Sequence, residues 1–263
     1  GFHLSVTGVA LATVLANIVS CMMVLYFLMH EAEEIRFHPK KLAVHGSVLR
    51  TILRIGIPAG VQGMVFSFSN VCIQAAVNTF GSAVVAGSAI SMNFEYITCF
   101  AFMGFNSAAV TFTSQNYGAG KAERCKRVFR ICMLCGVFIC LALDVFFYLG
   151  RDLWIGLFTT DAAAAACAAQ RMQIVLLLQC LACSYEISGS VLRGYGHSLT
   201  PALLTVFGTC VFRVIWVNTV VPAHHVLPVL FSVYPISWIV TGTMVLTAYV
   251  VVSRTALRSL QKS

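Results

Sequence analysis

Three carboxylates and one guanidinium lie inside long apolar stretches of this sequence, where ionisable groups are rare. They are Glu95, Asp144, Glu186 and Arg213. An ionisable side chain at membrane depth costs at least about 2.5 kcal/mol, so it usually faces a bundle interior, a partner or a watery cavity. Loss of solvent favours the neutral form of a carboxyl group, which suits a group that takes up and releases protons. We therefore expect proton or cation coupling at Glu95, close to mid-depth, and at Glu186, with a structural partnership as the alternative for each.

The other two deep charges favour structural roles. Asp144 lies near the outer end of its apolar stretch, so its carboxyl group is expected to reach the membrane interface. Arg213 is expected to balance one of the deep carboxylates. An anion contact or a gating pair is the alternative for Arg213.

A polar stripe recurs at four-residue steps along one apolar stretch. Its polar members are Gln62, Ser67, Asn70, Gln74 and Asn78, and Phe66 interrupts the four-residue steps. Residues four apart stay near one side of a helix, and amides in a membrane helix point toward other helices or a cavity. Interhelical hydrogen bonds would explain two or three of these residues, whereas five polar residues favour a surface that lines a substrate path. Phe66, Phe94 and Tyr185 are candidates to stack on a flat cation.

Seven apolar stretches must carry these residues. A membrane-spanning helix needs about 20 apolar residues, and seven runs qualify: Leu4–Met29, Ile55–Phe80, Val84–Phe112, Val128–Leu149, Met172–Leu192, Ala202–Ala223 and Val229–Val252. The chain of 263 residues is 59% hydrophobic and 10% charged, with mean hydropathy +0.87, whereas globular domains carry about 25% charged residues. The sequence predicts an all-α, polytopic membrane protein and excludes a soluble enzyme, a nucleic-acid binder and a disordered tail.

The basic residues predict how these helices are oriented. Fourteen of the 17 Lys and Arg residues fall in alternate loops, and only Arg151 and Arg171 fall on the other side. Cytoplasmic loops carry the excess of Lys and Arg, so residues 30–54, the loop near residue 120 and the C-terminus should face the cytoplasm from a cell membrane. The net charge of +8 is therefore interpreted as an orientation signal, with membrane lipid and no nucleic acid as partner.

The remaining motifs do not predict an enzyme or a metal site. Cys132-x-x-Cys135 and Cys180-x-x-Cys183 have zinc-like spacing, but their neighbours are Ile, Met, Leu and Ala, so we interpret these cysteines as small packing residues. Ser, His and Asp do not form a set at one depth, and the last run has no Lys for a Schiff base. Because the sequence begins at Gly1 without an initiator Met, we expect a fragment or a processed piece.

Three motifs, in order, carry a resemblance. They are Gly8-Val9-Ala10-Leu11-Ala12-Thr13-Val14, then Ser114-Gln115-Asn116-Tyr117-Gly118-Ala119-Gly120-Lys121, then Leu192-Arg193-Gly194-Tyr195-Gly196-His197-Ser198-Leu199-Thr200-Pro201. Together with Arg54-Ile55-Gly56-Ile57-Pro58, they resemble the C-terminal half of the multidrug and toxic compound extrusion (MATE) transporters. In the third motif His197-Ser198 replaces the family's usual Asp-Thr.

The resemblance implies twelve helices in two lobes that work by alternating access. Residues 1–29 would be the last helix of the N-lobe, residues 30–54 the interlobe linker, residues 55–252 the six-helix C-lobe and residues 253–263 a cytoplasmic tail. The rest of the N-lobe would be the missing partner. The implied function is a secondary active antiporter that exports cationic or amphipathic drugs and metabolites, with H⁺ or Na⁺ as coupling ion and without a cofactor.

The chain departs from the family at two positions. Some members carry an acid in the seventh helix and another in the tenth, where Phe66 or Ser67 and Ala182 stand here, with Glu186 one turn further along. This argues against the usual sodium site and directs attention to Glu95. Glu95→Gln is expected to leave folding intact and to remove gradient-driven efflux. A lipid-linked saccharide flippase of related fold and a non-transporting membrane scaffold or receptor are the alternatives.

Overall fold

Seven helical segments in the part of the chain that the structure describes are long and apolar enough to cross a membrane. The computed structural model describes residues 5–31, 36–38 and 43–260, in two units that comprise residues 1–52 and 53–263. The segments are Ala10–His30, Gly46–Asn78, Ser82–Gly118, Ala122–Leu149, Ala162–Gly194, Leu199–Ala223 and Leu227–Ala256. The prediction of an all-α chain with seven membrane helices is confirmed.

The first unit is dominated by one apolar helix, α1 (Ser5–His30). The side chains from Ala10 to His30 are exposed within the chain. A helix that is apolar on all sides is typical of a membrane span. Beyond its end, the Phe37 N–H donates to the Leu28 carbonyl (2.9 Å) and Arg36 donates to the Glu31 carbonyl (3.0 Å).

Helix α2 (Gly46–Asn78) begins inside the segment expected to be a linker. The helix continues without interruption through Pro58. The expected linker boundary at residue 54 thus falls within a helix, close to the boundary between the two units at Ile52.

The next helices, α3 (Ser82–Gly118) and α4 (Ala122–Leu149), are joined by the second of the motifs. Gly120 has a φ of 70°, and the Lys121 N–H donates to the Asn116 carbonyl (2.9 Å). The third motif ends α7 in the same way, with Gly196 at a φ of 88° and the His197 N–H bonded to the Leu192 carbonyl (2.9 Å). Glycine takes a positive φ without steric cost, so both motifs are tight helix ends.

The last three spans are interrupted helices. After the short α5 (Arg151–Gly156), the fifth span consists of α6 (Ala162–Ile174), the 3₁₀ segment η2 (Leu176–Leu181) and α7 (Ala182–Gly194). The sixth consists of α8 (Leu199–Thr205), the π-helical segment η3 (Val206–Val211) and α9 (Phe212–Ala223), and the seventh of α10 (Leu227–Phe231) and α11 (Val233–Leu260). Such irregular turns often mark functional hinges.

The fifth span begins ten residues before its predicted start at Met172. Asp161 caps α6 by accepting a hydrogen bond from the Ala163 N–H (3.0 Å). Arg171, expected in a loop, therefore lies inside the span and is 2% exposed. That expectation was wrong, because the alanine-rich first half of the span was not counted as part of the membrane helix.

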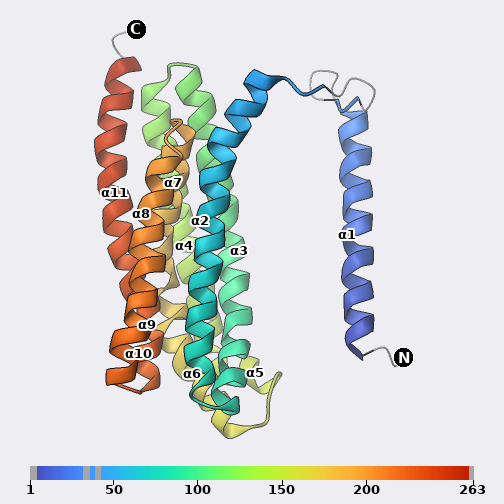
Figure 1. The fold of residues 1–263 in the computed structure, drawn as a ribbon, viewed down its shortest axis with the longest axis vertical. Helices are drawn as coiled ribbons and strands as arrows, with labels where there is room; N and C mark the ends of the chain where they lie inside the picture. Colours follow the sequence, from blue (N-terminus) through green and yellow to red (C-terminus); the bar gives the residue numbers. More distant parts are fainter. Residues whose placement is uncertain (1–4, 32–35, 39–42, 261–263) are drawn as a thin grey trace. The chain divides into compact units, whose positions relative to one another are not determined.

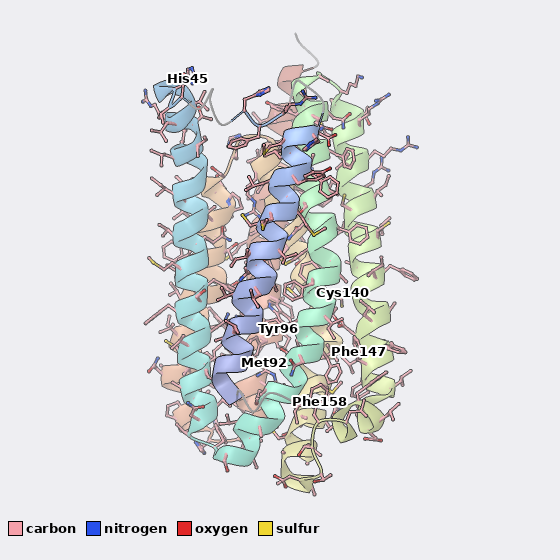
Figure 2. The ribbon with its side chains drawn as sticks, turned by 90° about the vertical axis from the view of Figure 1, so that its right-hand side faces the viewer. His45, Met92, Tyr96, Cys140, Phe147 and Phe158 are labelled. Carbon is pink, nitrogen blue, oxygen red and sulfur yellow. The ribbon has the colours of Figure 1, made fainter. Side chains whose placement is uncertain are left out.

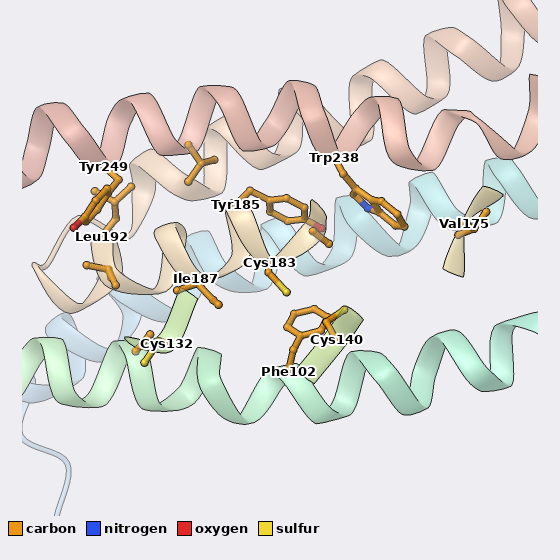
Figure 3. Close-up of a cluster of buried hydrophobic side chains, with 14 of the residues drawn as sticks. Phe102, Cys132, Cys140, Val175, Cys183, Tyr185, Ile187, Leu192, Trp238 and Tyr249 are labelled. Carbon is orange, nitrogen blue, oxygen red and sulfur yellow. The ribbon is translucent and has the colours of Figure 1, made fainter. Parts of the chain in front are cut away.

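In the second unit the spans run side by side (Figure 1). The α3–α4 turn, the α7–α8 turn and the end of α11 lie at one end, and α5 and the α9–α10 turn lie at the other. The main core joins α3, α4, α7 and α11 through Phe102, Cys140, Cys183, Tyr185 and Trp238 (Figure 3). Buried cysteines pack here as small apolar side chains, as the sequence predicts.

A second core cluster lies toward the α5 end of this unit. Phe94 of α3 contacts Phe147 of α4, with ring centroids 5.1 Å apart, and Phe158, at 5.8 Å. Figure 2 shows Cys140, Phe147 and Phe158 following one another toward that end. Phe94 therefore serves the core and is not free to stack on a substrate.

Candidate functional site

A cavity of about 330 Å³ lies within the second unit, between α2, α3, the fifth span, α9 and α11. Six aromatic side chains line it: Phe66, Tyr96, Phe102, Tyr185, Tyr234 and Trp238. Met92 and Met103 add adaptable apolar surface. Four charged side chains also reach it, namely Glu95, Arg171, Glu186 and Arg213. The volume falls in the usual range for small-molecule sites, about 300–1,000 Å³.

Most of the residues singled out from the sequence meet at this cavity. Six of the eight line it: Glu95, Glu186, Phe66, Asn70, Gln74 and Tyr185. Gln62 and Asn78 do not. Gln62 is half-buried and lies four residues before Phe66, while Asn78 is exposed and accepts a hydrogen bond from Gln74 (3.1 Å). The cavity is thus confined to the middle of the polar stripe.

Glu95 forms a two-pronged ion pair with Arg171. The Arg171 Nε donates to Glu95 Oε1 (2.7 Å) and the Nη2 to Oε2 (2.9 Å). Ser91 donates a further hydrogen bond to Oε1 (2.9 Å), and Gln179 donates to the Glu95 carbonyl (2.8 Å). The Arg171 guanidinium also lies 5.0 Å from the centroid of Tyr234. The charge of Glu95 is therefore balanced within the chain.

Glu186 has a different environment. It is half-buried, and its Oε2 accepts a hydrogen bond from the neutral Asn106 amide (2.9 Å). Ser190 orients that amide by donating to its oxygen (3.0 Å), and Arg193 donates to Ser190 (3.3 Å). The described part of the chain contains no salt bridge to Glu186. Among the described residues Glu186 is thus the cavity carboxylate without a salt bridge, although Arg193 is close enough to act on its charge.

Arg213 does not pair with a carboxylate among the described residues, so that expectation was wrong. Its Nε donates to Ser237 (3.0 Å) and its Nη1 to Asn70 (3.3 Å). The guanidinium lies 4.7 Å from the centroid of Tyr234 and 5.5 Å from that of Phe66. Hydrogen bonds and aromatic faces compensate this buried charge, while Glu95 is occupied by Arg171.

Asp144 does not reach the interface, contrary to expectation. Its side chain is 0% exposed. The segment η2 packs against this part of α4, and the backbone of Cys180 lies beside the carboxyl group. The position of Asp144 along its apolar run could not reveal this burial, because the residues that bury it belong to η2, the irregular segment of another span.

Sequence reasoning missed several cavity residues, and two of them had usable signals. Arg171 follows the capping residue Asp161 and an alanine-rich helix, which together place it in a membrane helix. Asn106 lies eleven residues, or three helical turns, after Glu95 and so shares its face. Tyr234 and Trp238 had no such signal, because aromatic residues are common throughout these spans.

These features define a multi-pass helical membrane protein with a polar and aromatic cavity inside one bundle. A family model described as MatE matches residues 58–217, and the chain belongs to this family, the MATE multidrug efflux transporters. The family is one of transporters and not of enzymes. The resemblance drawn from the three motifs is confirmed.

Individual relatives agree with this assignment. The chain is 22% identical over 241 residues to the multidrug export protein MepA of Staphylococcus aureus, and this match covers 90% of the chain and 51% of MepA. It is 24% identical over 208 residues to the probable multidrug resistance protein YoeA of Bacillus subtilis, with 78% of the chain and 45% of YoeA covered. The chain therefore spans about half the length of the curated relatives it matches.

Solved structures share the fold. A crystal structure of a MATE protein in the straight conformation aligns with a TM-score of 0.80 at 19% identity, covering 99% of this chain and 58% of that one. An outward-facing multidrug resistance MATE transporter aligns with a TM-score of 0.78 at 18% identity, covering 98% of this chain and 57% of that one. All but a few residues of this chain are thus matched by about half of a MATE transporter.

Proposed function

We propose that this chain is the C-terminal half of a secondary active antiporter that exports cationic or amphipathic drugs and metabolites across the cell membrane, driven by a proton or sodium gradient. The missing N-lobe would complete the transporter. The multidrug names of MepA and YoeA support export of drugs. Basic residues near the α3–α4 turn and in α11, such as Lys121, Arg124 and Arg254, support a cytoplasmic position for that end of the bundle.

The unpaired carboxylate of Glu186 is the observation that carries the substrate class. It stands at a cavity lined also by aromatic rings, methionines and two arginines. Arg171 donates to Glu95, and Arg213 donates to Ser237 and Asn70. Aromatic faces attract cations by about 0.5–2 kcal/mol each, most strongly when water is excluded. A lipophilic cation with flat rings would thus find one counter-charge and several stacking surfaces. Tyr185, next to Glu186 in α7, is well placed to contact such a ligand.

Glu95 and Arg171 would serve the coupling ion. Because Arg171 already neutralises Glu95, a substrate cation gains little by approaching Glu95. A proton bound by Glu95, or a cation that replaces Arg171, would instead break the ion pair. Arg171 stands in α6 just before η2, and Gln179 of η2 holds the Glu95 backbone. Loss of the ion pair would therefore affect η2, the 3₁₀ segment that interrupts the fifth span.

The cavity is poorly suited to a flippase that grips a pyrophosphate. Such a protein needs cations that are free to bind phosphate oxygens. Arg171 is occupied by Glu95, and Arg213, 1% exposed, already donates to Ser237 and Asn70. We assign Arg213 to holding α2, α9 and α11 together.

The test is ethidium efflux from cells that express the full-length protein with Glu186→Gln. Efflux should fall to the background of cells without the protein, while membrane protein levels stay unchanged because Glu186 forms no salt bridge with the described residues. Glu123→Gln is the matched control, since Glu123 is an exposed carboxylate that pairs with Lys126 in α4. Unchanged efflux in the Glu186 variant would overturn the substrate assignment.

A further inference from the structure

Asp144 is a buried carboxyl group outside the aromatic cavity. It lies near the end of α4, against α3 and η2. Its Oδ2 accepts a weak hydrogen bond from the Cys140 thiol (3.5 Å). Thr98 of α3 and the backbone of Cys180 in η2 lie beside it. Three helical elements therefore meet around one carboxyl group that is closed off from solvent.

Two oxygen atoms at this point lack hydrogen-bond partners. They are Asp144 Oδ1 and Thr98 Oγ1, and both side chains are 0% exposed. Buried polar atoms in proteins are almost always hydrogen-bonded, so an unpaired acid oxygen next to an unpaired hydroxyl group calls for an explanation. The two atoms come from different helices, α3 and α4, so a hydrogen bond between them would join these helices.

The titratable groups around Asp144 do not supply a counter-charge. Thiols lie near it on three elements: Cys140 in α4, Cys180 in η2 and, through its contact with Cys140, Cys183 in α7. Figure 3 shows Cys140 and Cys183 within the core. Glu95 faces it from α3, and the charge of Glu95 is already balanced by Arg171. Within the described ranges, none of these neighbours is a cation. An unpaired carboxylate in such surroundings is expensive, and a buried acid normally becomes neutral instead.

We propose that Asp144 is a proton-binding site, separate from the aromatic cavity, and that the structure represents its protonated, occluded form. A proton on Oδ1 is donated in a hydrogen bond to Thr98 Oγ1, which satisfies both unpaired atoms at once. A hard metal cation would need about six oxygen ligands, whereas the acid, one hydroxyl group and one stretch of backbone provide fewer. This proposal does not depend on drug export.

Release of the proton from Asp144 would affect the ion pair between Glu95 and Arg171. Thr98 follows Glu95 by three residues and so lies one turn along α3. Ionised Asp144 would place a second negative charge near Glu95, in competition for Arg171. Because the site is closed by η2, the proton exchanges with water only when the packing around this 3₁₀ segment opens.

Infrared spectroscopy of the full chain in detergent at neutral pH tests the proposal. The wild type should show the carbonyl stretch of a protonated carboxylic acid, and Asp144→Asn should remove it. Glu186→Gln, the control, should leave the band in place. In D₂O the band should shift slowly, because the group is occluded. A band that survives in Asp144→Asn, or that exchanges at once, overturns the proposal.

Thr98→Val provides a second test that keeps the acid. Without the hydroxyl acceptor the acid loses its hydrogen bond, so the carbonyl stretch should move to higher frequency; an unshifted band would contradict the proposal. Replacing choline chloride with NaCl at fixed pH should not change the band. Loss of the band in NaCl would show that the site takes sodium and not a proton.

Discussion

The ion pair between Glu95 and Arg171 makes a strong prediction about stability. Glu95→Gln leaves the Arg171 guanidinium, 2% exposed, without its two hydrogen bonds of 2.7 and 2.9 Å to a carboxylate. Removing one partner of a buried pair costs about 3–5 kcal/mol because the other charge stays buried and unpaired. The structure therefore replaces the sequence-based expectation that Glu95→Gln leaves folding intact. We now expect this variant to be strongly destabilised.

A variant that changes both Glu95 and Arg171 separates the cost of the unpaired charge from a simple loss of packing. Arg171→Met alone should also destabilise the chain, because it leaves Glu95 without its cation. Glu95→Gln combined with Arg171→Met removes both charges, and replacing a whole buried pair is often nearly neutral. The double variant should therefore be more stable than either single variant, with a coupling energy at least as large as the cost of Glu95→Gln alone, about 3–5 kcal/mol.

Equilibrium unfolding in mixed detergent–SDS micelles, followed by circular dichroism, measures these differences. Glu123→Gln with Lys126→Met is the matched control, since that pair is exposed at the surface of α4 and exposed pairs contribute little. The control cycle should show no measurable coupling. If Glu95→Gln unfolds within about 1 kcal/mol of the wild type, the argument that Arg171 depends on this carboxylate is refuted.

Two further variants test how the helices are built and packed. A Cβ at Gly87 would collide with the Ala164 carbonyl and lie 3.0 Å from the Ala168 nitrogen, so Gly87→Ala should cost about 1–3 kcal/mol in the same unfolding assay. Gly104→Ala, which meets nothing within 4 Å, is its control; equal stability of the two variants would contradict the close α3–α6 packing. Asp161→Ala should cost about 1 kcal/mol by removing the cap of α6, and an unchanged unfolding midpoint would show that the cap does not stabilise the span.

The sequence predicts the spans well because a membrane helix requires a long apolar run. Its limits appear where a span is only moderately apolar, as in the alanine-rich α6 that carries Arg171. The break at η2 was also invisible, since Leu176–Leu181 contains neither Gly nor Pro. Its 3₁₀ geometry depends on packing against neighbouring helices.

The candidate site was predictable in its residue types but not in its pairings. Glu95 and Glu186 were recognised as deep acids, but which of them is neutralised depends on contacts between residues about 80 positions apart. Arg213 could have met either acid by sequence alone. Its actual partners, Ser237 and Asn70, are ordinary polar residues on two other helices. Which side chains from separate helices pair depends on how the helices are arranged in three dimensions, and the order of residues in the sequence does not give that arrangement.

The most direct test of the central claim is cation binding by the purified full-length protein in detergent. Titration with ethidium, followed by fluorescence, should show that Glu186→Gln weakens binding at least tenfold, or about 1.4 kcal/mol. Glu123→Gln should bind as the wild type does. Equal affinity of the wild type and the Glu186 variant would contradict the claim that this carboxylate is the counter-charge for the substrate.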